Sequence, residues 1–307
     1  MMPAASLRAL LSGTIDYAGL FPPATLDLEK AIRNHAEYVR HPDRWMLGAF
    51  ILPIAEFDAA CRWLTEFDRE HPLRISALGP RTESGEGFLA SLSGAEAAMA
   101  GFQSKFGSVA SIEQLEMPLP SDLGAELFAS ARETLKQAKA KVFWEAPAKS
   151  ARAAIGLIAE NNKAGSGRGF GFKLRTGGVT AEAFPPSDSL ASVLFAAANH
   201  AVPIKFTAGL HHPVRVFHES VQTRMHGFLN VLGAGVLTLA HSWTEPQIAE
   251  MLEDEDPSSF RFTEDAFSWH DWKISTEKIA SSRRLVTSFG SCSFDEPRED
   301  LRALNLL

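Results

Sequence analysis

The sequence predicts an α/β protein built as a closed barrel of eight βα units, a (β/α)8 or TIM barrel. Short apolar segments recur along the 307 residues, and helix-like stretches of crossover length separate most of them. The composition, 45% hydrophobic and 22% charged residues, is typical of a chain that buries a core without disulfides or metals. We expect one domain over residues 1–307, with strands one to seven in residues 14–210. Residues 211–307 should form an elaborated closing region and a C-terminal helical extension.

Seven strands are predicted from the apolar segments, many of them rich in residues that suit a buried strand. Their expected ranges are residues 14–18, 45–53, 73–78, 111–117, 141–146, 169–175 and 203–208. The helices between them are expected over residues 26–40, 54–70, 123–139, 148–162 and 187–200. Thr25 is the expected N-cap of the first of these helices.

The eighth strand, which would close the barrel, has two candidates. Residues 260–267 are the first, and the apolar run over residues 226–240 is the second. Gly233 and Gly235 argue against a simple helix in that run, because glycine weakens helices. Residues 275–307 should hold a helical portion, a Gly/Ser turn at SFGSCSFDEP and a last helix.

Net charge indicates which partners are not expected to bind, and the cysteine content indicates the redox compartment. Thirty basic against 37 acidic residues give a net charge of -7, which argues against nucleic acid and anionic membranes as partners. Cys61 and Cys292 lie far apart and outside any CxxC spacing, which suits a reducing compartment without structural zinc. No run of 18 apolar residues occurs, so no membrane span is expected and the cytoplasm is the default location. A homo-oligomer is compatible with this charge and composition.

Charged residues stand at the ends of four predicted strands, where a βα barrel carries its functional groups. These residues are Glu116, Glu145, Lys173 and Lys205. Because side chains alternate along a strand, the charges face the barrel interior if their apolar neighbours face the helices. An unpaired buried charge costs several kcal/mol, so the four should form one mutually compensating cluster.

Two lysines on adjacent strands indicate covalent chemistry. Each ammonium should depress the pKa of the other, and a neutral lysine amine attacks carbonyl carbon. A nearby carboxylate can then move the protons. The pattern therefore favours an enzyme that forms a Schiff base and needs no metal or other cofactor. The alternative is that Lys173 and Lys205 only make ion pairs with Glu116 and Glu145, without turnover.

Several motifs in residues 14–210 resemble a known family. IDYAGLFPPATLDLEKAIRNHAEY is similar to the opening of deoxyribose-phosphate aldolases and related class I aldolases. The segments QLEM, KVFWEA, GFKLRTGG and PIKFTAG occur in the order of that family's fourth to seventh strands, at similar spacing. The resemblance implies a lyase, or a related carbonyl-condensing enzyme, on the same barrel.

The resemblance also implies roles for individual residues. Lys173 matches the family's Schiff-base lysine and Lys205 the second lysine, which tunes the first. Glu116 stands where the family has an aspartate proton shuttle, and Glu145 stands at an acidic position of strand five. Asp16 matches the aspartate of the first strand, although the next residue, Tyr17, replaces a usual histidine.

The substrate is expected to be a small anionic aldehyde or keto metabolite. A guanidinium binds carboxylate or phosphate bidentately, and glycine turns expose backbone N–H groups to an anion. The expected substrate-binding residues are Asp16, Arg175, Thr176, Gly177, Gly178, Thr207, Gly209 and His211. Phe21, Pro22 and Pro23, after the first strand, could form an aromatic wall. Whether the anion is a carboxylate or a phosphate stays open.

Two other classes of function remain. A metal-assisted hydrolase or isomerase would use His211 or His212 with the carboxylates, although no HxH or HExxH spacing supports a metal site. A non-catalytic barrel would bind an acidic metabolite with the same basic cluster. Cys292 has no identified His or Asp partner in the sequence, which favours a structural thiol.

Overall fold

The computed structural model describes residues 3–122, 124–165 and 169–307. Eight parallel strands form a closed barrel, which confirms the predicted (β/α)8 fold. They are β1 (Ile15–Tyr17), β2 (Leu47–Pro53), β3 (Leu73–Leu78), β4 (Ala110–Pro118), β5 (Lys141–Glu145), β6 (Gly171–Arg175), β7 (Ile204–Thr207) and β13 (Val286–Ser291). Around the barrel the order is β1-β13-β7-β6-β5-β4-β3-β2. All seven strands predicted from the sequence are present.

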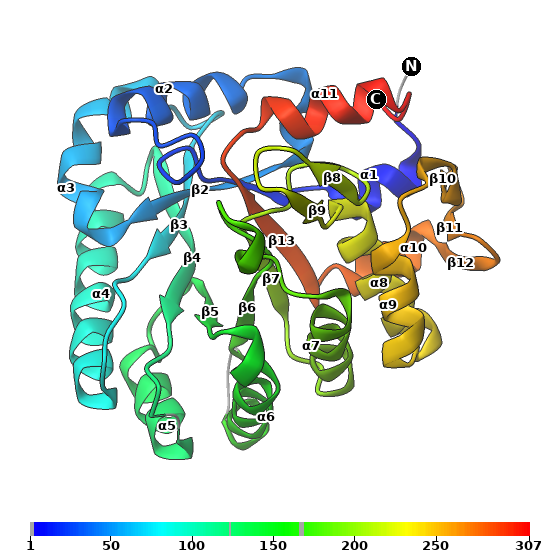
Figure 1. Ribbon diagram of the computed structural model, residues 1–307. Coiled ribbons are helices and arrows are strands. Elements are labelled where there is room, and N and C mark those ends of the chain that lie inside the picture. Colours follow the sequence, from blue (N-terminus) through cyan, green and yellow to red (C-terminus); the bar gives the residue numbers. More distant parts are fainter. Residues whose placement is uncertain (1–2, 123, 166–168) are drawn as a thin grey trace.

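Helices surround the barrel and connect its strands (Figure 1). The α-helices are α1 (Ala5–Leu11), α2 (Leu28–Tyr38), α3 (Phe57–Ala60), α4 (Gly85–Phe106), α5 (Ala125–Thr134), α6 (Ala148–Ala164), α7 (Ser187–Asn199), α8 (Phe228–His241), α9 (Glu245–Glu253), α10 (Thr276–Ser282) and α11 (Asp295–Ala303). Short 3₁₀ helices add η1 (Pro42–Met46), η2 (Ile54–Glu56), η3 (Cys61–Glu66), η4 (Ala181–Ala183) and η5 (Pro257–Ser259).

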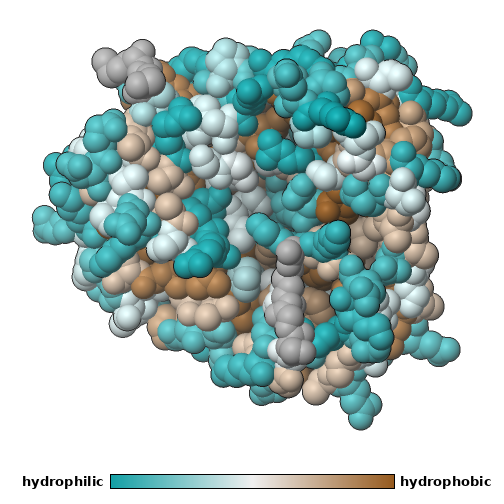
Figure 2. Space-filling model, turned by 180° about the vertical axis from the view of Figure 1, so that it is seen from behind, coloured by the Kyte–Doolittle hydropathy of each residue, from teal (hydrophilic) through white to brown (hydrophobic). Residues whose placement is uncertain are grey.

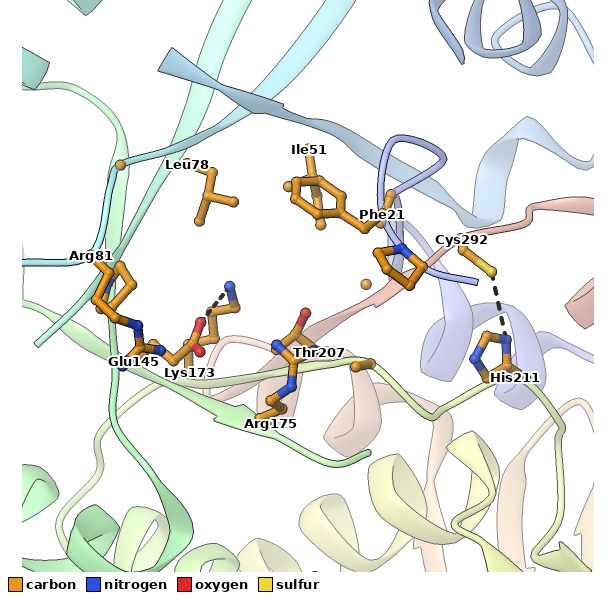
Figure 3. Close-up of a pocket in the computed structure, with 16 residues that line it drawn as sticks. Phe21, Ile51, Leu78, Arg81, Glu145, Lys173, Arg175, Thr207, His211 and Cys292 are labelled. Carbon is orange, nitrogen blue, oxygen red and sulfur yellow. Dashed lines mark hydrogen bonds and ion pairs between the residues drawn. The ribbon is translucent and has the colours of Figure 1, made fainter. Parts of the chain in front are cut away.

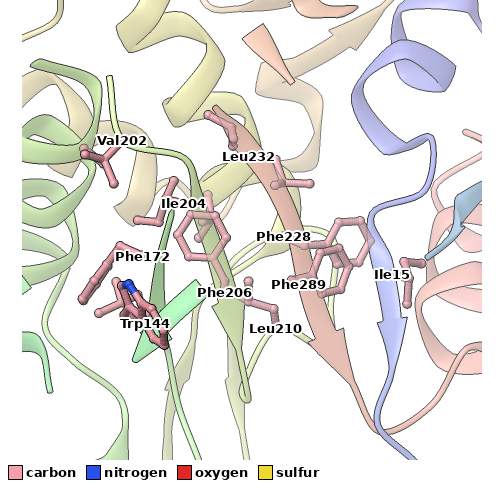
Figure 4. Packing of buried hydrophobic residues seen from close by; sticks show 14 of the residues in the cluster. Ile15, Trp144, Phe172, Val202, Ile204, Phe206, Leu210, Phe228, Leu232 and Phe289 are labelled. Atoms are coloured by element: carbon pink, nitrogen blue, oxygen red, sulfur yellow. The ribbon is translucent and has the colours of Figure 1, made fainter. Parts of the chain in front are cut away.

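Alternation along the barrel strands separates an apolar outer face from a polar interior. Phe172 and Phe206 are completely buried in the apolar core, as Figure 4 shows for the β6–β7 side of the barrel. Burial of each such side chain contributes roughly 1.5–3 kcal/mol. Lys173 and Lys205, which alternate with these phenylalanines along β6 and β7, are buried with polar partners. The core that closes the barrel therefore also fixes the direction of its charged side chains.

Both candidates for strand eight are wrong. Residues 226–240 lie largely in α8, and residues 260–267 cover β10 (Phe260–Phe262) and the start of β11 (Ala266–Trp269), in a small antiparallel sheet with β12 (Trp272–Ser275). The closing strand is β13, which includes the first part of the predicted Gly/Ser turn. The glycines of α8 serve packing instead: a Cβ on Gly235 would lie 2.8 Å from Val286 of β13.

The predicted helices differ from the observed ones in several places. Asp27, rather than Thr25, caps α2 by accepting a hydrogen bond from the Lys30 amide at 2.8 Å. The helix expected over residues 54–70 is the succession η2, α3 and η3. The long helix α4 was not predicted, since its four glycines weaken the helical signal. The helix predicted over 123–139 corresponds to α5, and residue 123 lies outside the described residues.

The closing region is elaborate, as the sequence predicts. After β7 the chain forms the hairpin of β8 (Val216–His218) and β9 (Thr223–Met225), then α8, α9, the small sheet and α10 before it enters β13. The last helix, α11, then crosses the barrel end near α2 (Figure 1). Tyr38 of α2 donates a hydrogen bond to Asp295 of α11 at 2.7 Å. The C-terminal helix is thereby attached to the first βα unit.

The surface on the back of the molecule is mixed in polarity. Figure 2 shows hydrophobic side chains there in separate patches between hydrophilic ones. Within the described residues, no helix combines the length and the apolar character that crossing a membrane requires.

Candidate active site

A polar network occupies the barrel interior around Lys205. Its side chain is 0% exposed, and its ammonium donates to Asp16 Oδ2 and Gln114 Oε1, each at 2.7 Å, and to Glu116 Oε1. Asp16 also accepts hydrogen bonds from the Ser288 hydroxyl and the Ala49 amide, each at 2.7 Å. An ammonium and carboxylates that are buried away from water are stable only when they are paired and hydrogen-bonded in this way.

Lys173 lies beside this network and completes the predicted cluster. It is the direct neighbour of Lys205 across β6 and β7, and of Glu145 across β5 and β6. Its Nζ is 2.7 Å from Glu116 Oε2 and 2.8 Å from Glu145 Oε2. Glu116 therefore bridges the two lysines, one through each carboxylate oxygen. The cluster expected from alternation is present, with Asp16 as its fifth charged member.

The expected depression of the Lys173 pKa is wrong in direction. Burial lowers the pKa of Lys173, but the contacts with the Glu116 and Glu145 carboxylates raise it more, so the net shift is upward. Burial likewise raises the pKa of Glu116, and the two lysine ammonium groups lower it more, so its net shift is downward. Sequence reasoning expected the four charges to cluster, but it gave the repulsion between the lysines more weight than their direct contacts with carboxylates.

A cavity of about 300 Å³ opens above the cluster, at the carboxyl ends of the strands. Apolar residues and a few convergent polar groups line it, as in small-molecule sites. The lining residues are Ala18, Phe21, Pro22, Ile51, Leu78, Gly79, Arg81, Pro118, Glu145, Lys173, Arg175, Thr207, Ala208, His211, Gly290 and Cys292. In Figure 3, Lys173 and Glu145 lie on one side of this cavity, and His211 and Cys292 on the opposite side.

Only part of the predicted site lines the cavity. Glu145, Lys173, Arg175, Thr207 and His211 do so. The aromatic wall is also present, because Phe21 and Pro22 belong to the lining, whereas Pro23 does not.

The other predicted residues are not among those that line the cavity. Lys205, Glu116 and Asp16 are sealed beneath it with no exposed side-chain surface. Glu116 contacts Lys173, which lines the cavity.

The predicted anion loop packs against protein instead of lining the cavity. Thr176 is buried, and its hydroxyl donates to the Ala208 carbonyl at 2.6 Å. Gly177 lies so close to Gly209 that a Cβ on it would come within 2.8 Å of the Gly209 Cα. A Cβ on Gly178 would meet the Ala183 side chain at 2.7 Å. These glycines allow close approach of backbone and neighbours, a common reason for glycine after a strand.

Comparisons with known proteins add little to this geometry. The sequence matches no protein-family model, and no curated protein is similar to it. One similar solved structure is the atrazine chlorohydrolase TrzN from Arthrobacter aurescens TC1, complexed with zinc. The TM-score is 0.31 and the identity 10%; the match covers 65% of this chain and 54% of the other, about half of its length. A likeness this weak carries no argument, and the strand pairing itself establishes the barrel.

Among the lining residues with polar or reactive side chains, Arg81 and Cys292 were not predicted to belong to the site. Arg81 follows β3 by three residues, so the rule that functional groups follow barrel strands could have found it. Cys292 directly follows β13, which was not recognised as a strand. Its Sγ lies 3.9 Å from His211 Nδ1, so the thiol has the histidine partner that the sequence did not reveal.

The two histidines after β7 each pair with a carboxylate of α11. His211 Nδ1 is 3.0 Å from Glu296 Oε2, and His212 Nδ1 is 2.6 Å from Asp300 Oδ2. In residues 3–122, 124–165 and 169–307, no three His, Cys, Asp or Glu side chains converge as metal ligands would. The predicted combination of His211 or His212 with Glu116 and Glu145 is therefore not formed.

Proposed function

We propose that this chain is a Schiff-base-forming lyase, or a related carbonyl-condensing enzyme, with Lys173 as its nucleophile. The observation that carries the proposal is the position of Lys173, whose amine lies between two carboxylates beside a cavity of ligand size. An amine that contacts acid–base groups and is accessible from a pocket suits covalent catalysis on a carbonyl. The resemblance to class I aldolases implies the same reaction type.

The first step requires that Lys173 give up a proton, because its raised pKa keeps the resting amine charged at neutral pH. Glu145 is the proton acceptor in this scheme. Its carboxylate touches the amine at 2.8 Å and its side chain is 12% exposed, whereas Glu116 is 0% exposed. The neutral amine then adds to the substrate carbonyl, and one of its own protons moves to the carbonyl oxygen. Glu145 returns its proton to the same oxygen, which leaves as water and gives the protonated Schiff base.

The two carboxylates oppose deprotonation of Lys173 in the first step, but they favour the later steps, in which the nitrogen is again positively charged. The protonated Schiff base carries its positive charge on the same nitrogen, between Glu116 and Glu145. Groups already oriented toward a developing charge stabilise it without reorganisation. The iminium then accepts the electron pair of a neighbouring C–C or C–H bond, which is the lyase or condensing step.

Lys205 is a positioning residue in this scheme. It has no exposed surface and reaches Lys173 only through Glu116, so it does not contact substrate. Its ammonium holds one oxygen of Glu116 and helps to lower the pKa of that carboxyl. Glu116 thereby presents its second oxygen to Lys173 in ionised form.

A small anionic aldehyde or keto compound fits the rest of the lining. Arg81 and Arg175 belong to the same cavity as Lys173, and a guanidinium binds carboxylate or phosphate bidentately. Thr207 adds a hydroxyl, and Phe21, Ile51 and Leu78 add apolar surface. This composition favours a substrate with an acidic end and a short carbon skeleton.

Borohydride reduction tests the proposal. Incubation with a panel of small aldehydes and keto acids, followed by reduction and peptide mass spectrometry, should give a stable adduct on Lys173. Lys173→Arg keeps the charge without a comparable nucleophile and should remove the adduct, and Lys141→Arg, at an exposed position of β5, is the matched control. No adduct on the wild type, or an unchanged adduct in Lys173→Arg, would overturn the proposal. Saturable binding without an adduct would instead indicate a non-catalytic barrel.

A further inference from the structure

The cavity holds a second group of reactive side chains that the Schiff-base scheme does not use. Cys292 and His211 line the cavity on the side away from Lys173 in the view of Figure 3, and the dashed line there joins the two. They come from segments more than 80 residues apart in sequence, one following β7 and the other following β13. Glu296, in the first turn of α11, contacts the same ring nitrogen of His211, Nδ1, at 3.0 Å.

The contacts give His211 a defined charge state. Burial lowers the pKa of His211, but the contacts with Cys292 and Glu296 raise it more, to about 9. The hydrogen bond with His211 is the main reason that the pKa of Glu296 is lowered. At neutral pH His211 is therefore an imidazolium, and its Nδ1–H lies 3.0 Å from the Glu296 carboxylate and 3.9 Å from the Cys292 sulfur.

The imidazole of His211, 3.9 Å from the Cys292 sulfur, is placed to interact with that atom when it reacts in the cavity. The second ring nitrogen of His211, Nε2, makes no hydrogen bond with any described residue. It therefore remains a donor for an oxygen atom that develops charge in the cavity. A thiol that attacks an alkylating agent needs no such donor, because no charge develops on a carbonyl oxygen, whereas a thiol that adds to a carbonyl does.

We infer that Cys292, His211 and Glu296 form a second nucleophilic site in the cavity, at which the Cys292 thiol adds reversibly to an aldehyde. In this step the S–C bond forms and the carbonyl π electron pair moves to oxygen. That oxygen takes a proton from His211, and the thiol proton returns to the imidazole through solvent. The product is a hemithioacetal, with no oxidation, no leaving group and no co-reactant.

The first test is the rate of iodoacetamide labelling at pH 7, measured separately at Cys292 and Cys61 by peptide mass spectrometry. Cys61 is the internal control, because it is also half-buried but donates to the Phe57 carbonyl at 3.2 Å and has no histidine partner among the described residues. Cys292 should react at least about 10-fold faster than Cys61. Rates within about threefold of each other would overturn the inference.

Two variants assign the effect to the neighbours of Cys292. His211→Gln should slow labelling of Cys292 about 10-fold, and Glu296→Gln should slow it by a smaller factor, while Cys61 stays unchanged in both. A variant that fails to fold reveals itself by faster labelling of Cys61. Since Glu296 is 39% exposed, its substitution tests the site even if His211→Gln does not fold. Unchanged labelling of Cys292 in folded variants would contradict the role of the imidazolium.

The last test concerns the aldehyde. Propanal should protect Cys292, and not Cys61, from iodoacetamide with a saturable concentration dependence. The same protection in Lys173→Arg would show that no Schiff base is needed for it. Protection that disappears in Lys173→Arg, or none in the wild type, would overturn the assignment of an aldehyde. Iodoacetamide labelling requires no carbonyl compound. The reactivity of Cys292 and the proposed lyase activity of Lys173 are therefore tested independently.

Discussion

The two lysines at the centre of the barrel occupy directly paired positions of adjacent strands, yet their surroundings differ. Lys205 is 0% exposed and its ammonium is held by oxygen atoms of Asp16, Gln114 and Glu116. Lys173 is 5% exposed, contacts two carboxylates and lines the cavity. One ammonium is thus part of the sealed interior, and the other lies at its boundary. The comparison teaches that access, and not residue type or register, separates a structural lysine from a candidate nucleophile.

Substitution of each lysine by methionine should show the largest difference between them. Lys205→Met leaves Asp16 and Glu116 without their shared cation in a sealed interior, and breaking such a buried pair costs about 3–5 kcal/mol of unfolding free energy. Lys173→Met should cost less, about 1–3 kcal/mol, because Glu145 borders the cavity and water can reach it.

Urea unfolding monitored by circular dichroism measures both values. Lys141→Met, at an exposed position, is the matched control and should leave the midpoint unchanged. Equal losses for Lys173→Met and Lys205→Met would mean that the two surroundings do not differ in the way described.

Substitution of a glutamate should affect adduct formation only where the carboxylate borders the cavity. Glu145→Gln removes the proposed proton acceptor at the cavity, and should slow formation of the borohydride-trapped adduct about 100-fold. Glu113→Gln makes the same chemical change at an exposed position of β4 and should have no effect. An adduct that forms at the wild-type rate in Glu145→Gln would assign the proton transfer to another group.

The smallest expected effect is the pH dependence of stability that His211 contributes, on the side of the cavity opposite Lys173. The pKa of His211 is raised from 6.5 to about 9, so its protonation stabilises the folded state fully below pH 6.5, and this contribution is lost as pH rises through 9. Because its partner Glu296 is 39% exposed, we expect a loss of only about 1–2 kcal/mol over this interval.

The unfolding free energy measured by urea at several pH values tests this. His211→Gln should flatten the pH dependence between 6.5 and 9, whereas His200→Gln, at an exposed position of the chain, should retain it. A flat wild-type profile would contradict the charge state inferred for His211.

Much of the barrel could be predicted because its first seven strands are locally apolar and helix-like crossovers separate most of them. β13 could not, since its sequence VTSFGS has few large apolar residues. The residues of β13 that face the barrel interior are small. One of them, Ser288, donates a hydrogen bond to Asp16 at 2.7 Å. Without this strand the sequence analysis interpreted Cys292 as a structural thiol, because its position next to the cavity follows from β13.

The sequence by itself determined the fold class and the direction of Glu116, Lys173 and Lys205, because alternation along a buried strand leaves only the barrel interior for charges between apolar residues. Tertiary structure alone decided which of these charges meets the cavity, how many carboxylates surround each ammonium and that His211 faces Cys292. The physical reason is that pKa and access depend on distances between residues from different strands. A local pattern carries no information about those distances.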